Sequence, residues 1–149
     1  RDEAADNLSG RIKGGKDGNS FILYRGAGKE IAVTQNDIRA LQAAKSAIRA
    51  GVSILLKKAK IGPAEIKKVY IAGAFGSNLK EGGLSTVGIL EKDWLGKVEF
   101  VGDAALNGAV LALQDDKKAE AEEIAKEAKY VSLSGSAHFE KEFLRNMGF

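Results

Sequence analysis

Two apolar runs that end in glycine are the features of this sequence that could bind a ligand. Val69-Tyr70-Ile71-Ala72 carries no charge and breaks at once into Gly73 and Gly76. Val98-Glu99-Phe100-Val101 ends in Gly102 in the same way. A glycine after a buried strand frees the backbone at the carboxyl end of a parallel sheet, where open α/β folds bind their ligands. Backbone N–H groups there could face a phosphate, or the ribose and base of a nucleotide. The two exits together predict one crevice.

Neither run is a complete nucleotide-binding motif. No Gly-Lys-Ser/Thr follows the glycines, so neither is a P-loop, and Gly73 with Gly76 lacks the first glycine of a dinucleotide fingerprint. The alternative is that the glycines only allow tight turns and close packing of helices on the sheet. Each loop alone fits both interpretations, and the presence of two favours a ligand.

A long helix over residues 35–59 is predicted to lie between a hairpin and the first of these runs. Thr34 can cap it, with Asp37 as the acid of a capping box. Lys45 interrupts its apolar stripe, so this lysine either packs its stem while its amine reaches solvent or belongs to a site. The spacing alone favours the first interpretation. The stripe consists of Ile38, Leu41, Ile48, Val52, Leu55 and Ala59.

The remaining pattern predicts an α/β domain with a mixed sheet. Residues 21–24 and 30–33 form an antiparallel hairpin, whereas strand–helix–strand units give parallel pairs. Helices are expected over 79–90, 103–114 and 117–128, the last with Ala121, Ile124, Ala125 and Ala128 inward. Residues 130–133 would be a further strand, followed by a closing helix whose core anchors are Phe139, Phe143 and Met147.

Composition excludes several classes of protein. The 149 residues, 44% hydrophobic and 29% charged, are one domain's worth of ordinary globular sequence. No apolar run approaches the roughly 20 residues of a membrane helix, and no signal peptide is recognisable, so we expect a soluble, cytoplasmic protein. There is no cysteine for a disulfide or iron–sulfur cluster, and one histidine argues against a metal site. The net charge of +3 is dispersed, so nucleic-acid binding is not expected.

Four segments, in their order and spacing, resemble the C-terminal part of the reductive activators of corrinoid proteins. They are residues 34–39, 42–51, 70–76 and 100–109, and the ending with Phe139, Phe143 and Phe149 is similar to that family's tail. That family belongs to the superfamily of acetate and sugar kinases, heat-shock chaperone ATPases and actin, whose two ribonuclease-H-like lobes clamp ATP. The resemblance implies a C-terminal lobe over residues 20–149, with helices on both faces of its sheet. Residues 1–19 are expected to be a loose lead-in, and the start at Arg1 suggests a piece of a longer protein.

The resemblance also implies a nucleotide site and a reaction for the full-length protein. In the family, ATP with Mg²⁺ drives reduction of cobalt(II) to cobalt(I) in a corrinoid protein of a methyltransferase system, and an N-terminal iron–sulfur domain supplies the electron. The phosphate motifs, Mg²⁺-linked aspartates and cysteines of the family lie upstream and are absent here. We therefore expect no catalytic or metal-binding residue, and an isolated chain that binds nucleotide weakly without hydrolysing it. Residues implied to border the nucleotide are Gly73, Ala74, Phe75, Gly76, Gln42, Lys45, Arg49 and Gly102.

Two alternatives remain open. The chain could be a non-catalytic interaction or dimerisation module, in which a row of small residues on the long helix seats a partner or a second copy. That row is Ala40, Ala44, Ala47 and Gly51. It could also resemble the activators of radical 2-hydroxyacyl-CoA dehydratases, which share the fold and the use of ATP. Those activators usually hold a bridging iron–sulfur cluster on cysteines that this sequence lacks.

Overall fold

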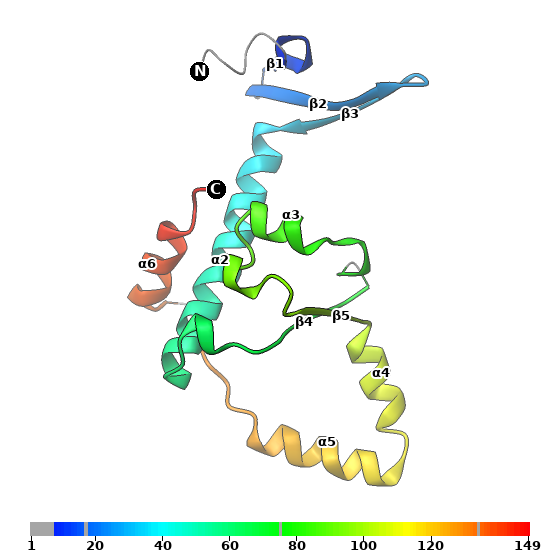
Figure 1. Ribbon diagram of the computed structural model, residues 1–149, viewed down its shortest axis with the longest axis vertical. Helices are drawn as coiled ribbons and strands as arrows, with labels where there is room; N and C mark the ends of the chain where they lie inside the picture. Colours follow the sequence, from blue (N-terminus) through cyan, green and yellow to red (C-terminus); the bar gives the residue numbers. More distant parts are fainter. Residues whose placement is uncertain (1–7, 17, 75, 134) are drawn as a thin grey trace. The chain divides into compact units, whose positions relative to one another are not determined.

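The computed structural model describes residues 8–16, 18–74, 76–133 and 135–149. The chain divides into two compact units. The first extends to Ala44 and includes Gly148, and the second comprises Lys45–Met147 with Phe149. The long helix, drawn as the cyan to green ribbon in Figure 1, contributes residues to both units, since the division falls between Ala44 and Lys45.

The first unit contains an antiparallel sheet in the order β1-β2-β3. The predicted hairpin is confirmed as β2 (Gly18–Gly26) and β3 (Lys29–Thr34), with Phe21 opposite Val33. Its two-residue turn has positive φ at both Ala27 and Gly28, the conformation that suits the twist of a tight hairpin.

Part of the predicted lead-in is ordered structure. After a 3₁₀ helix η1 (Ser9–Arg11), strand β1 (Ile12–Gly15) pairs with β2. The expectation of a loose segment up to residue 19 is therefore wrong for this strand. All four of its residues are exposed, so backbone pairing rather than burial places it, and an apolar pattern could not reveal it.

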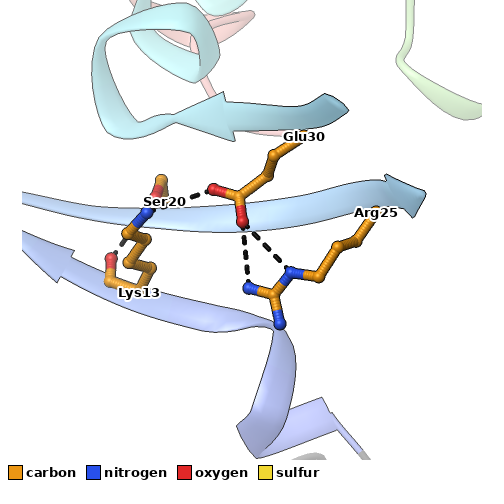
Figure 2. A network of polar contacts seen from close by, with 4 residues as sticks. All are labelled: Lys13, Ser20, Arg25 and Glu30. Atoms are coloured by element: carbon orange, nitrogen blue, oxygen red, sulfur yellow. Dashed lines mark hydrogen bonds and ion pairs between the residues drawn. The ribbon is translucent and has the colours of Figure 1, made fainter. Parts of the chain in front are cut away.

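Glu30 connects the three strands of this sheet. Its carboxylate accepts hydrogen bonds from Arg25 on β2, at 2.9 and 3.2 Å, and from Lys13 on β1, at 3.2 Å (Figure 2). To the left of Glu30 in the same view, the Ser20 hydroxyl donates to the Lys13 carbonyl oxygen at 3.3 Å. The bonds from Arg25 and then Lys13 hold the pKa of Glu30 below its ordinary value.

Helix α2 (Gln35–Ala59) begins and ends as predicted. Thr34 donates its N–H and hydroxyl to the Asp37 carboxylate at 2.8 and 2.7 Å, and the Asp37 N–H donates to the Thr34 hydroxyl at 3.1 Å. This reciprocal cap satisfies donors that a helix start leaves unpaired. After the helix, Pro63 opens the 3₁₀ helix η2 (Pro63–Glu65).

The second unit is built on parallel strands β4 (Val69–Ala72) and β5 (Val98–Gly102). Its buried core consists of Leu84, Leu90 and Trp94, packed against half-buried side chains of α2 and both strands. The predicted helix over 79–90 is shorter than expected: η3 (Gly76–Asn78) precedes α3 (Glu81–Thr86), and η4 (Lys92–Trp94) follows. Two adjacent glycines within α3 weaken its propensity, and Gly88 ends the segment at a φ of +82°.

Helices α4 (Ala104–Leu111), α5 (Asp115–Glu127) and α6 (Ala137–Arg145) complete the second unit. The predicted strand over 130–133 is wrong, because these residues are in no strand of the described chain. Inward packing of α5 is wrong as well, since Ile124 is 63% exposed. Phe139 and Phe143 stack at 6.0 Å but are only half-buried, so they are not the core anchors that we expected.

The buried face of α2 is not the predicted apolar stripe. Ser46 is fully buried and donates its hydroxyl to the Asn146 carbonyl oxygen at 2.9 Å, just beyond α6. At Gly51, a Cβ would stand 3.3 Å from Leu133, so the missing side chain lets this segment approach. Small residues thus face Leu133 and Asn146, on either side of α6 in the sequence, whereas Ile48 and Leu55 of the stripe are about half exposed.

Candidate functional site

The structure brings the two glycine exits together, as the sequence predicts. Gly73 follows β4, Gly102 ends β5, and the Gly73 N–H donates a 2.7 Å hydrogen bond to the Gly102 carbonyl oxygen. Their φ angles are +107° and +64°, values at which a side chain strains the backbone. The exits of two parallel strands are therefore fixed to each other by backbone alone.

The glycines of these exits have two different roles. At Gly73 and Gly102, no atom of a described residue beyond the chain neighbours lies within 4 Å of where a Cβ would stand. Both glycines are half-buried, and the space that a side chain would occupy is open at each. Gly76 is buried, and a Cβ on it would stand 3.3 Å from the Ile71 side chain. Close packing thus explains Gly76, whereas open space leaves Gly73 and Gly102 available to a ligand.

Asp103 closes the start of helix α4, directly after Gly102. Its carboxylate accepts the N–H of Leu106 at 3.2 Å. A carboxylate in this position stabilises the helix dipole and uses one of the donors that could otherwise bind an anion. This exit is therefore better suited to an uncharged part of a ligand than to a phosphate.

Lys45 does not reach solvent. It is 4% exposed, and its Nζ lies 5.0 Å from the centroid of the Phe149 ring. Gly88 lies against the same amine, because a Cβ on Gly88 would stand 3.1 Å from it. The interpretation of a lysine whose amine extends into water is wrong, and the ammonium group is held between a glycine and an aromatic ring.

Arg49 lies in a separate cleft. Its guanidinium pairs with the carboxylate of Glu91, and both line a cavity of about 560 Å³ in the second unit. The cleft is bounded by α2, the segment around Pro63 and α6, and Ser53 donates to Glu142 at 3.2 Å along it. The residues that line this cleft do not include the glycines of the strand exits or Lys45.

The predicted nucleotide-binding residues thus fall into distinct places. Ala74 is exposed beside Gly73, and Phe75 lies outside the described residues. Gln42 is half-buried on the part of α2 that belongs to the first unit. Glu91 and Gly88 were not predicted. Their partners, Arg49 and Lys45, are about 40 residues away in the sequence, and no local motif indicates these contacts.

Known proteins were compared with this chain. The sequence model of one family, described as the C-terminal domain of RACo, the ASKHA domain, matches residues 2–149. This chain belongs to that family. The match to the RACo family model begins at residue 2, whereas the resemblance found from the sequence motifs implied a lobe over residues 20–149 only.

Two relatives agree with membership of the RACo family. A solved structure described as a reductive activator for corrinoid, iron–sulfur protein superimposes with a TM-score of 0.81 at 37% identity. The match covers 91% of this chain and 22% of that one. The corrinoid activation enzyme RamQ of Eubacterium limosum is 36% identical over 92 residues, which are 62% of this chain and 16% of RamQ. The chain therefore spans about a fifth of the length of these relatives.

The family confirms the predicted fold class, an α/β lobe of the actin-like ATPase type. The predicted antiparallel and parallel pairings are both present, but the described strands form two separate sheets, one antiparallel and one parallel, rather than the single mixed sheet that we expected. The described residues contain no cluster of His, Cys, Asp or Glu that could hold a metal ion. Among them, no helix is long and apolar enough to cross a membrane.

Proposed function

We propose that this chain is the adenosine-side lobe of an ATP-dependent reductive activator of a corrinoid protein. In the full-length protein, ATP would help to drive reduction of cobalt(II) to cobalt(I) in a corrinoid/iron–sulfur methyltransferase system. The observation that carries the proposal is the joined pair Gly73 and Gly102, with open space where side chains would stand, in a chain of the RACo family. Both relatives have names that refer to corrinoid activation, which supports a corrinoid partner.

The parts of the site would have separate tasks. Gly73, Ala74 and Gly102 would let the base and ribose approach the strand exits without a side chain in the way. Gly76 would hold the loop in place by packing on Ile71. The Asp103 cap makes the start of α4 unfavourable for a phosphate, which agrees with the adenosine side.

The helix α2 would contribute the cations. Lys45 offers a buried ammonium group, and Arg49 a half-buried guanidinium that is already neutralised by Glu91. Water screens a buried ammonium group less than a more exposed group, so we assign the stronger contribution to Lys45, with Gln42 and Arg49 as weaker contacts.

The chemistry that needs Mg²⁺ and an iron–sulfur cluster belongs to the rest of the protein. This sequence contains no cysteine, and its described residues contain no acidic cluster for Mg²⁺. When bound, Mg²⁺ would neutralise the phosphates of ATP. The isolated chain is therefore expected to bind nucleotide weakly and to hydrolyse none.

The test uses the full-length protein and follows cobalt(I) formation by absorbance with and without ATP. Lys45→Met keeps the length of the buried side chain but removes its charge, and we expect ATP-dependent reduction to fall about tenfold, the loss of one charged contact. Lys58→Met, at an exposed lysine of the same helix that does not line the Arg49 cleft, is the matched control and should retain full activity. Full activity of Lys45→Met would remove Lys45 from the site, and absence of ATP binding by the wild-type protein would refute the function.

A second candidate is an interaction or dimerisation module, favoured by apolar surfaces within the second unit. Ile48 and Leu55 on α2, and Leu106 and Val110 on α4, are each about half exposed. Ala47 of the small-residue row is exposed too, although Gly51 packs on Leu133. Equilibrium sedimentation of the isolated chain, with Ile48→Lys as the variant, separates the two. A dimer that dissociates in Ile48→Lys would support the module.

A further inference from the structure

The ammonium group of Lys45 is covered by an aromatic ring that is itself exposed. Lys45 is 4% exposed, whereas Phe149, whose ring centroid lies 5.0 Å from Nζ, is 64% exposed. A cation over an aromatic face is attracted by the ring's quadrupole. The contact therefore joins a residue deep in the second unit to one at its surface.

Gly88 and Phe149 form a socket around the ammonium group of Lys45, and the lack of a side chain at Gly88 leaves room for that group. A Cβ on Gly88 would stand 3.1 Å from Nζ and 3.8 Å from Cδ of Lys45, so a larger residue would press on the lysine. Its φ of +82° also disfavours any other residue. The amine thus contacts the backbone side of Gly88 and the ring of Phe149.

The ring can leave at small cost. Because most of Phe149 is in contact with solvent, its release uncovers little additional apolar surface. The backbone at Gly88, in contrast, is fixed by the Gly88 N–H, which donates to the Ser85 carbonyl oxygen at 3.1 Å. Phe149 is the part of the socket that can open.

We infer that Phe149 is a displaceable cover over Lys45 and that the base of the bound nucleotide takes its place. The inference rests on the proposed function, in which Lys45 contacts the nucleotide. A ligand that reaches Nζ must first remove what covers it, and a purine ring offers the same flat aromatic face to the cation. Phe149 and the base then compete for one position, and the covered state lowers the apparent affinity for nucleotide.

The first test measures the dissociation constant of Mg²⁺-ATP for the full-length protein by calorimetry. Phe149→Ala should bind about two- to fivefold more tightly, the worth of one exposed cation–π contact. Phe149→Tyr keeps the ring and should bind like the wild-type protein. Leu144→Ala, which truncates a comparably exposed residue on α6, is the matched control and should leave the constant unchanged.

The second test measures how accessible the Lys45 amine is when no nucleotide is present. Acetylation of lysines by an N-hydroxysuccinimide ester, followed by mass spectrometry, should modify Lys45 faster in Phe149→Ala than in the wild-type protein, with exposed Lys57 as the internal reference. Equal or weaker ATP binding by Phe149→Ala, or an unchanged rate at Lys45, overturns the cover while the proposed function stands. Absence of ATP binding in all of the variants and the wild type overturns both.

Discussion

The backbone N–H of Gly73 donates a 2.7 Å hydrogen bond to the carbonyl oxygen of Gly102. The bond lies where the β4–β5 ladder becomes irregular, between Ile71 and Ala72. Because both glycines have positive φ, the geometry of this junction depends on the absence of side chains. The same absence of side chains leaves open space beside both strand exits, where the proposed nucleotide would approach.

Gly73→Ala should destabilise the protein without a steric clash. At a φ of +107° the new Cβ meets open space but strains the backbone, and we expect the free energy of unfolding to fall by about 1–2 kcal/mol. Urea denaturation measures the change. Gly82→Ala, also in open space but within helix α3, is the control and should gain about 0.5–1 kcal/mol. Equal effects of the two substitutions would show that conformation at Gly73 is unimportant.

Trp94 connects the core of the second unit to the turn at Pro63. It is 5% exposed, and its Nε1–H donates to the Pro63 carbonyl oxygen at 2.8 Å. Trp94→Phe removes this hydrogen bond and leaves the Pro63 carbonyl oxygen only the Ile66 N–H, at 3.3 Å, so the free energy of unfolding should fall by about 0.5–1.5 kcal/mol. Circular dichroism measures the loss, since the variant lacks the only tryptophan. Leu95→Ala, at an exposed neighbour, should change stability by less than about 0.5 kcal/mol.

The Arg49–Glu91 pair should be more strongly coupled than a surface pair. The Arg49 side chain is 17% exposed, whereas those of Lys68 and Glu99 are 62% and 52% exposed. A double-mutant cycle with Arg49→Met and Glu91→Gln should give a coupling of about 1 kcal/mol that persists in salt. The cycle at Lys68 and Glu99 is the reference, and its coupling should vanish as salt is added. Identical salt dependence of the two cycles would contradict a partly buried pair.

Local chemistry made much of the fold predictable. Thr34 and Asp37 mark the start of α2 because both partners of the cap are three residues apart. The strands that end in Gly73 and Gly102 are short apolar runs with a clear stop, so their pairing and exits followed from sequence. The meeting of Gly73 and Gly102 was predictable because the backbone itself sets the geometry at the end of each strand.

Contacts between distant residues made the rest unpredictable. The buried face of α2 depends on Ser46 and Asn146, which are 100 residues apart, and no periodicity records that partner. The position of Lys45 depends likewise on Gly88 and Phe149. Helix α5 is alanine-rich and carries one large apolar residue, Ile124, so it has little surface to bury and its predicted inner face stayed exposed.

Asp37 should make the start of α2 sensitive to acid. The N–H of Thr34, and then its hydroxyl, hold the pKa of Asp37 below its ordinary value. The unfolded chain therefore binds the proton more readily, and the stabilisation is fully present above the unfolded pKa, about 3.9, and lost as the pH falls through the folded one. Urea midpoints of the wild-type protein and Asp37→Asn should differ at about pH 6 and converge towards about pH 2. A difference that is constant over this range would mean that the carboxylate's charge has no part in the cap.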